Sequence, residues 1–142
     1  MTIAEGVQIG TAPPGDGRAK PRTPKCRGSR PQISPDGRYL GVMGYHSMYV
    51  YDLPALGKPR RISASSSFGD FRSLAFHPSG KMMAVIHGGP TLVKEYELPD
   101  LRLRHKYKWN LGALESVAYS PDGTLGAAGS TDGRVVVWDV EG

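Results

Sequence analysis

The sequence has little of what secreted, membrane-spanning or zinc-binding proteins need. Cys26 is the only cysteine among 142 residues, which excludes an intrachain disulfide and a zinc site of cysteine spacing. No apolar run approaches the roughly 18 residues of a membrane helix. Residues 1–10 lack the basic start and the long apolar stretch of a secretory signal. We therefore expect a cytoplasmic protein whose fold rests on packing alone.

Recognisable catalytic arrangements are also missing. The four histidines form no His/Asp/Glu group with metal-ligand spacing, and we interpret them as structural or solvent-facing: His46, His77, His87 and His105. Residues 77–81 end in Gly-Lys but lack the upstream glycine and the final Ser or Thr of a phosphate-binding loop. The sequence contains no Gly-x-Ser-x-Gly motif and no evident pair of carboxylates. We therefore predict no catalytic residue, no metal and no cofactor.

Turn formers and positive charge are plentiful but unevenly placed. Nineteen glycines and twelve prolines suit a fold with short strands and many turns. Residues 1–30 hold six basic and two acidic residues, and so most of the chain's net charge of +5. These residues lack the interleaved aromatics of a nucleic-acid platform, which argues against nucleic-acid binding. We predict that residues 1–30 are a flexible, basic, Pro/Gly-rich N-terminal segment. The predicted folded region, residues 31–142, is nearly neutral.

A four-residue turn recurs at constant spacing. It occupies residues 34–37, 77–80 and 120–123, and its prolines are 43 residues apart: Pro35, Pro78 and Pro121. Proline fixes φ at one corner of such a turn, and glycine tolerates positive φ at the other, here Gly37, Gly80 and Gly123. A period of this length is typical of arrays, solenoids and propellers.

The residues around each turn predict strands. Alternating apolar residues precede the later turns, Leu74 and Phe76 in one copy and Val117 and Tyr119 in the next. Residues 39–44, 81–86 and 124–130 follow the turns, and their apolar, Gly/Ala-rich composition predicts second strands buried on both faces. Third strands are predicted to end at residues 51–52, 96–97 and 138–139. A fourth strand is predicted in two copies only, at residues 59–63 and 101–109.

Residues 101–109 alternate strictly between two kinds of side chain. The basic ones share one side of the predicted strand: Arg102, Arg104, Lys106 and Lys108. Edge strands commonly carry Lys and Arg, which prevent unwanted pairing with other chains. The alternative is a basic strip that binds an acidic partner.

These motifs resemble a known family. Residues 114–140 contain the runs SVAYSPDG, AAGSTDG and VVVWD, which together look like one WD repeat. Residues 71–98 and 30–53 are similar to it with more differences, and the family's repeat positions include Trp138, Asp132 and Asp139. The resemblance implies an all-β fold of β-propeller blades, each with four antiparallel strands. The chain would hold about three blades, as an open arc or as part of a larger ring.

The resemblance also implies a buried polar network, which is only half present. In the family, a hydrogen-bonded set links the Trp of the third strand, a Ser or Thr, a turn Asp and a His. Trp138 and Asp132 match this set, but Ala128 stands at the Ser/Thr position and Asn110 where the His is expected. The first and second repeats have Tyr51 and Tyr96 in place of the Trp and no matching turn Asp, so we expect packing to replace the network there.

Three blades are too few for a closed ring, because propellers have about four to eight. In closed propellers of this family a strand from the other terminus completes the last blade, and residues 6–10 have alternating apolar residues for that role. The chain is a piece of a longer propeller, a short protein that completes its ring by self-association, or an open three-blade arc. We expect isolated chains to self-associate through unpaired terminal sheets, since two copies would give six blades, within that range.

The function that the resemblance implies is a non-catalytic scaffold for protein–protein interaction. The expected partners are other proteins or a second copy, and neither nucleic acid nor a membrane. One alternative is a regulatory or sensor segment of a larger propeller-containing protein. Another is a propeller-type hydrolase, which would need polar ligands that converge at the starts of the strands, and the sequence offers none.

Overall fold

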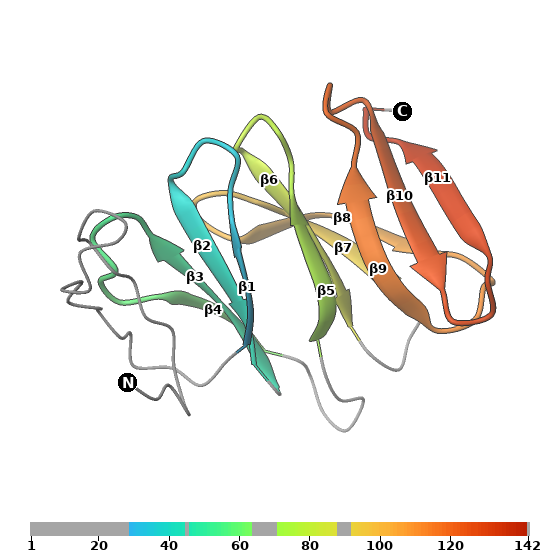
Figure 1. Cartoon of the computed structure of the whole chain (residues 1–142), viewed down its shortest axis with the longest axis horizontal. Helices are drawn as coiled ribbons and strands as arrows, with labels where there is room; N and C mark the ends of the chain where they lie inside the picture. Colours follow the sequence, from blue (N-terminus) through green and yellow to red (C-terminus); the bar gives the residue numbers. More distant parts are fainter. Residues whose placement is uncertain (1–28, 45, 64–70, 88–91, 142) are drawn as a thin grey trace, which may run out of the picture.

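The computed structural model describes residues 29–44, 46–63, 71–87 and 92–141, and in these ranges the chain is all-β. Three antiparallel sheets follow one another along the sequence and lie side by side as an open arc (Figure 1). No helix occurs in the described ranges, and so no helix there could cross a membrane. The predicted all-β architecture of three successive blades is confirmed.

Each sheet is a meander in which a strand pairs with its neighbours in sequence. Sheet 1 contains β1 (Ser29–Ile33), β2 (Tyr39–Met43), β3 (Ser47–Asp52) and β4 (Arg60–Ser63). Sheet 2 contains β5 (Phe71–Phe76), β6 (Met82–His87), β7 (Leu92–Glu97) and β8 (Arg102–Lys108). Sheet 3 contains β9 (Leu114–Tyr119), β10 (Leu125–Ser130) and β11 (Val135–Asp139), with no fourth strand among the described residues. The predicted second and fourth strands are confirmed.

β1 accommodates a proline at a position where strands usually need a hydrogen-bond donor. The register with β2 shifts between Ser29 and Gln32, so Pro31 lies in a bulge. β1 is also an edge strand, paired on one side only. Proline is tolerated at bulges and on edges because no ladder hydrogen bond is lost there.

The recurring turns form as predicted, with glycine at positive φ: 75° at Gly37, 74° at Gly80 and 77° at Gly123. In the first turn the Ser34 hydroxyl donates to Asp36 Oδ1 at 2.7 Å and accepts from the Tyr39 amide at 3.0 Å. This side-chain bridge satisfies backbone groups that the tight turn leaves unpaired.

Two apolar interfaces join the three sheets. Sheet 1 meets sheet 2 through a cluster that comprises Tyr39, Met43, Met48, Val50 and Ile62 with Phe71, Leu74, Phe76, Met83, Val85 and Tyr96. Sheet 2 meets sheet 3 through Ala75, Ala84, Ile86 and Val93 with Leu114, Val117, Ala128 and Trp138. Sheet 2 is therefore covered on both faces, and each end sheet turns one face away from it.

The prediction that all second strands are buried on both faces is correct for β2 and β6 and wrong for β10. All five residues of β2 are buried, as are Met82 to Ile86 in β6. In β10 only Gly126 and Ala128 are buried, and Leu125 is exposed. β10 also consists of apolar and small residues, but no described element covers its second face.

Several sequence predictions fall on the N-terminal part of the chain. Residues 1–28 lie outside the described residues, and with them Cys26 and the predicted closing strand at residues 6–10. β1 begins at Ser29, two residues before the predicted start of the repeat region at residue 31.

Candidate interaction surface

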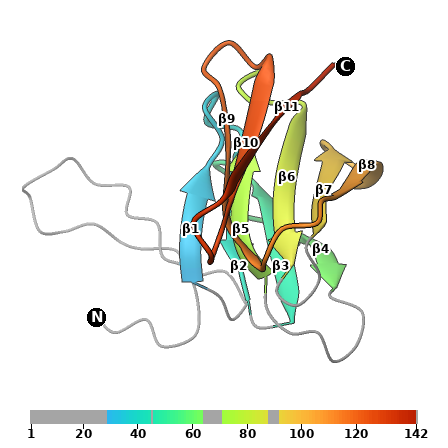
Figure 2. The ribbon, with the colours of Figure 1, turned by 90° about the vertical axis from the view of Figure 1, so that its right-hand side faces the viewer.

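One face of sheet 3 is covered by no other element of the described residues, and we call it the free face. The register of β9, β10 and β11 places Ala118, Ala127 and Val137 in one row across the sheet, and Ser116, Gly129 and Val135 in the next. The alternate residues, including Val117, Ala128 and Trp138, pack against sheet 2. Because side chains alternate along a strand, the first two rows and Leu125 point away from sheet 2. Figure 2 looks toward this end of the arc.

The same positions are buried in the other two sheets. Leu125 lies four residues after its turn proline and is 40% exposed. Tyr39 and Met82 occupy the equivalent positions in sheets 1 and 2 and are 4% and 3% exposed. Val137 pairs with Ala127 as Val50 does with Gly41, yet Val137 is 59% exposed and Val50 is 1% exposed. The free face therefore has the side chains of an interior interface without a covering sheet.

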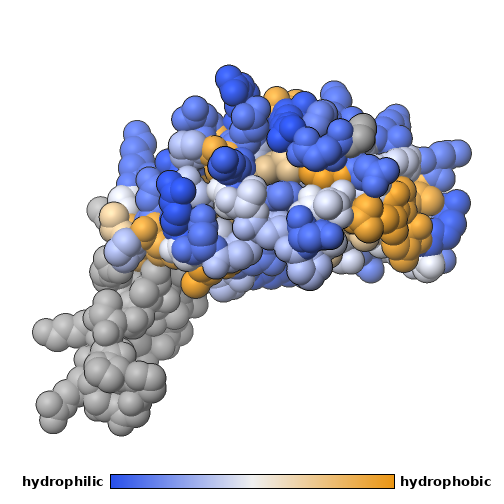
Figure 3. All heavy atoms as spheres, turned by 90° about the horizontal axis from the view of Figure 1, so that it is seen from above, coloured by the Kyte–Doolittle hydropathy of each residue, from blue (hydrophilic) through white to orange (hydrophobic). Residues whose placement is uncertain are grey.

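The exposed side chains form a patch of apolar surface. Val135 is the most exposed, at 67%, and with Leu125 and Val137 it accounts for three of the five large hydrophobic residues that are exposed among the described residues. Figure 3 shows apolar atoms gathered at the end of the molecule that sheet 3 occupies. Full burial of a Val or Leu side chain contributes about 1.5 to 3 kcal/mol. Contiguous apolar patches of this kind mark interaction sites.

The turns also pack from sheet to sheet. A Cβ atom on Gly80 would lie 3.0 Å from the Asp36 carboxyl carbon, and one on Gly123 would lie 2.6 Å from His77 Cε1. His77 Nε2 is 2.8 Å from the Gly123 carbonyl oxygen, and its Nδ1 is 2.8 Å from Ser79 Oγ. His77 therefore has a structural role, since it joins the second turn to the third.

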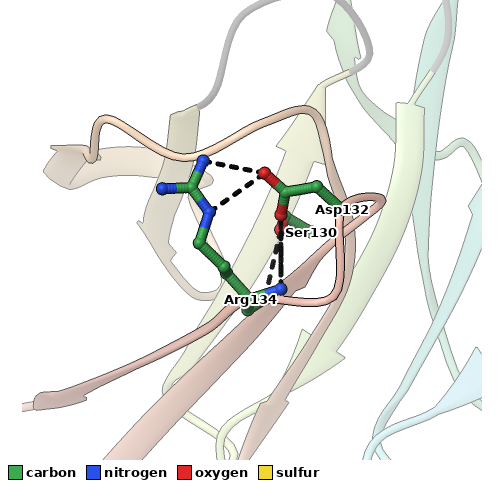
Figure 4. A network of polar contacts seen from close by, with 3 residues as sticks. All are labelled: Ser130, Asp132 and Arg134. Atoms are coloured by element: carbon green, nitrogen blue, oxygen red, sulfur yellow. Dashed lines mark hydrogen bonds and ion pairs between the residues drawn. The ribbon is translucent and has the colours of Figure 1, made fainter.

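The turn between β10 and β11 is held by a polar network (Figure 4). Asp132 Oδ1 accepts from the Ser130 hydroxyl and from the Arg134 amide, the latter at 3.2 Å. Asp132 Oδ2 accepts from Arg134 Nε at 2.9 Å and from Nη2 at 2.7 Å. The Arg134 guanidinium, followed by the Ser130 hydroxyl, holds the pKa of the Asp132 carboxyl well below its usual range. The network fixes the loop beside the free face.

Acid is expected to weaken these turns. Hydrogen bonds from the Ser120 hydroxyl and from Thr124 lower the pKa of Asp122 to about 2. A carboxyl whose folded pKa is depressed stabilises the fold above its unfolded pKa, and that contribution is lost as the pH falls toward the folded value. We therefore expect the unfolding free energies of the wild type and Asp122→Asn to converge between about pH 5 and about pH 2.

Urea unfolding at a series of pH values measures this convergence. Asp100→Asn is the control, because Asp100 is an exposed turn residue without a hydrogen bond from its side chain in the described structure. A gap between wild type and Asp122→Asn that stays constant over this pH interval would contradict the prediction.

Trp138 does not join Asp132 in a polar network. The indole lies in the interface with sheet 2, 8% exposed, and its Nε1 has no hydrogen-bond partner among the described residues. Ala128, at the family's Ser/Thr position, packs in the same cluster. Aromatic rings surround the indole instead: Trp109 and Tyr107 lie 5.2 and 5.5 Å from Trp138, centroid to centroid.

The predicted basic strip on the outer strand is interrupted, so the strict alternation predicted for residues 101–109 is wrong at one point. The register of β7 with β8 shifts between Glu95 and Tyr96, which makes a bulge at Arg104. Arg104 lies 3.9 Å from Glu141, which follows β11 of sheet 3, and 3.8 Å from Met82 Sδ of β6 in its own sheet. Arg102 pairs with Glu97 at 3.4 Å. Only Lys106 and Lys108 of the four are left exposed with no ion pair in the described structure.

The structure contains a buried carboxylate that the sequence analysis missed. Glu95 on β7 is 0% exposed; it accepts from the Tyr119 hydroxyl at 2.5 Å and lies 3.2 Å from His105 Nδ1. Burial, together with the neighbouring Glu95 carboxylate, raises the pKa of Tyr107 to about 12. One signal was available: Glu95 stands where the other two repeats have Val50 and Val137. Glu95 links sheets 2 and 3, since Tyr119 belongs to β9.

The described residues offer no metal centre. No group of three or more His, Cys, Asp or Glu side chains lies close enough together to hold an ion in the part of the chain that the structure describes. His46 is exposed, and His105 is engaged with Glu95.

Comparisons with known proteins agree with this architecture. A family model described as "WD domain, G-beta repeat" matches residues 102–139, which is β8 followed by sheet 3. The β-propeller domain of Cps50 (Swd1) from Myceliophteria thermophila superposes with a TM-score of 0.70 at 14% identity, over 81% of this chain and 40% of that one.

Sequence relatives cover a smaller region. "Small ribosomal subunit protein RACK1" of Caenorhabditis elegans is 32% identical over 69 residues, 48% of this chain and 21% of the relative. "MST50-interacting protein 11" of Pyricularia oryzae is 33% identical over 66 residues, 46% of this chain and 21% of that protein. The chain thus matches about a fifth of the length of these relatives. Residues 102–139 match the WD repeat of the G-beta type, and the three sheets have the fold of neighbouring β-propeller blades, arranged as an open arc.

Proposed function

We propose that this chain is a non-catalytic interaction scaffold that binds other proteins through the free face of sheet 3. The observation that carries the proposal is the exposure of Leu125, Val135 and Val137 at positions that the next sheet covers in sheets 1 and 2. A flat apolar sheet face suits a protein surface, whereas small-molecule sites are concave and enclose their ligand.

The comparisons and the chemistry of the surface support a binding role. One relative is named as an interacting protein and others as ribosomal proteins, so proteins with this repeat take part in assemblies. The free face consists of apolar and small residues, together with the Ser116 hydroxyl. Such a surface binds by exclusion of water and offers no acid–base pair for a reaction. The cytoplasmic location remains a prediction from the sequence.

A pull-down from extracts of the source cells tests the proposal. Val137→Asp places a charge in the middle of the free face, and we expect it to lose most of the protein that the wild type retains, because an unpaired carboxylate cannot be buried in an apolar contact. Ala55→Asp is the matched control, since Ala55 is exposed in the turn between β3 and β4. Equal retention by wild type, Val137→Asp and Ala55→Asp would refute binding through this face.

A further inference from the structure

We propose that the free face of sheet 3 binds β1 and the first turn of a second copy of this chain, so that two chains associate head to tail. This inference rests on the proposed function and names one protein that occupies the free face, a second copy of this chain, which excludes any other protein from the face while it is bound.

In sheets 1 and 2, the first strand of the following sheet packs on the face that is equivalent to the free face. A Cβ atom on Gly41 of β2 would lie 3.2 Å from Leu74 and 3.2 Å from Phe76, so the first strand of sheet 2 lies directly on β2. In the next interface Val117 and Tyr119 of β9 pack in one cluster with Ala75 and Ala84. Each covered face thus receives the first strand of the following sheet onto small residues.

The free face has the same small residues in the same places. Ala127 lies six residues after its turn proline, as do Gly41 and Ala84, and its partner on β9 is Ala118. Ala118 is exposed and Ala127 is half-buried. The free face therefore has room for an incoming first strand with larger apolar side chains.

The chain carries such a strand at its other end. Ile33 lies two residues before the turn proline, as do Phe76 and Tyr119, and it is 58% exposed although its two counterparts pack against the preceding sheet. Leu40 and Val42, on the same face of sheet 1, are already 2% and 0% exposed. The part of a second copy that is available to contact the free face is therefore its edge strand β1, from which the apolar side chain of Ile33 protrudes.

The turns at the two ends are complementary as well. Asp36 lies against Gly80, and His77 lies against Gly123. The first and third turns lack such a neighbour on their outer sides: a Cβ atom on Gly37 of the first turn would meet nothing within 4 Å, and Asp122 of the third turn is exposed. Head-to-tail contact would bring Asp122 of one copy against Gly37 of the other, which repeats the internal arrangement.

The contact must join different molecules. Sheets 1 and 3 lie at opposite ends of the arc (Figure 1), so β1 cannot reach the free face of its own chain. The three described sheets form an open arc and do not close into a ring by themselves. Two copies that each cover the other's sheet 3 would form a closed ring with two-fold symmetry, which leaves no apolar end exposed.

Light scattering over a range of concentrations tests the proposal with two variants at opposite ends of the arc. We expect the wild type to show twice the mass of the 15.3 kDa chain. Val137→Asp and Ile33→Asp should each give monomers, whereas the control Ala55→Asp should remain dimeric. Circular dichroism and urea unfolding verify that each variant is folded.

An equimolar mixture of the two variants distinguishes head-to-tail contact from other modes. In a head-to-tail pair, one interface would contain both aspartates and the other would be entirely wild type, so the mixture should regain dimers that neither variant forms alone. In a Cys26→Ser background, a short bismaleimide should link an Ile33→Cys chain to an Ala127→Cys chain and should link neither variant to itself.

Two outcomes overturn the inference: a wild type that is monomeric at every concentration, or an Ile33→Asp variant that dimerises normally while Val137→Asp does not, which would indicate contact between two copies of sheet 3. A monomeric wild type whose Val137→Asp variant still loses proteins in the pull-down would refute the second copy and leave the proposed function intact. A head-to-tail dimer with an unchanged pull-down would refute binding of other proteins through the free face.

Discussion

Gly126→Ala is expected to lower the unfolding free energy by about 3 kcal/mol, because overpacking a filled interface forces rings out of their rotamers. A Cβ atom on Gly126 would overlap with Trp138 Cζ2 and Cε2 and would lie only 2.8 Å from Cη2. The indole has little room to move, since it packs against Trp109 at 5.2 Å and Tyr119 at 6.5 Å, centroid to centroid. The strain therefore falls on the interface between sheets 2 and 3.

Urea unfolding followed by tryptophan fluorescence measures this loss, since Trp109 and Trp138 are the only tryptophans and lie in the same cluster. Gly129→Ala is the matched control: it is in the same strand, but its Cβ would point to the free face, 3.6 Å from Ser116 Oγ. We expect a change below about 0.5 kcal/mol there, as for surface substitutions. Equal midpoints for the two variants would contradict the role given to Gly126.

Glu95→Ala is expected to destabilise the protein by a similar amount, about 3 kcal/mol, because it leaves the Tyr119 hydroxyl without its buried acceptor and opens a cavity. The Glu95 carboxylate is fully buried and is shared between Tyr119 and His105. Burial, followed by the hydrogen bond to Glu95, raises the pKa of Tyr119 far above its usual range, so this phenol stays protonated and remains a donor.

A double-mutant cycle with Tyr119→Phe separates the hydrogen bond from the cavity. If the bond contributes as expected, Glu95→Ala and Tyr119→Phe together should cost about 1 kcal/mol less than the sum of their separate effects. Tyr49→Phe, on a half-buried tyrosine of sheet 1, is the control and should be additive with Glu95→Ala. Additivity in both cycles would show that Glu95 and Tyr119 are not coupled.

Much of the fold could be predicted because its signals are local. The recurring Pro-x-Gly turn forces a positive φ at each glycine, and Gly37, Gly80 and Gly123 adopt it. The apolar, Gly/Ala-rich segments after the turns predicted the second strands, and the alternation of residues 101–109 predicted the outer strand β8, each to within one residue at each end. Both features depend on a few residues that are neighbours in the sequence, so the amino-acid sequence alone predicts them.

The candidate site was less predictable because it depends on the register in which strands pair and on which sheets pack together. Strict alternation predicted four basic residues on one side of β8, but pairing with β7 introduced a bulge that turned Arg104 toward Glu141. His105 was interpreted as structural or solvent-facing, and its contact with Glu95 arises only because β7 and β8 pair in that register. A bulge has no fixed sequence signature, so pattern reading cannot locate it.

The sequence by itself determined the turns, the strands and their order, because backbone preference and side-chain alternation act over a few residues. Only the tertiary structure decided which faces are covered. All three second strands, β2, β6 and β10, were predicted from apolar and small residues, yet β10 alone has an exposed face, because no other described sheet packs on that face. The free face with Leu125, Val135 and Val137, and the burial of Glu95 between sheets 2 and 3, are therefore properties of sheet packing.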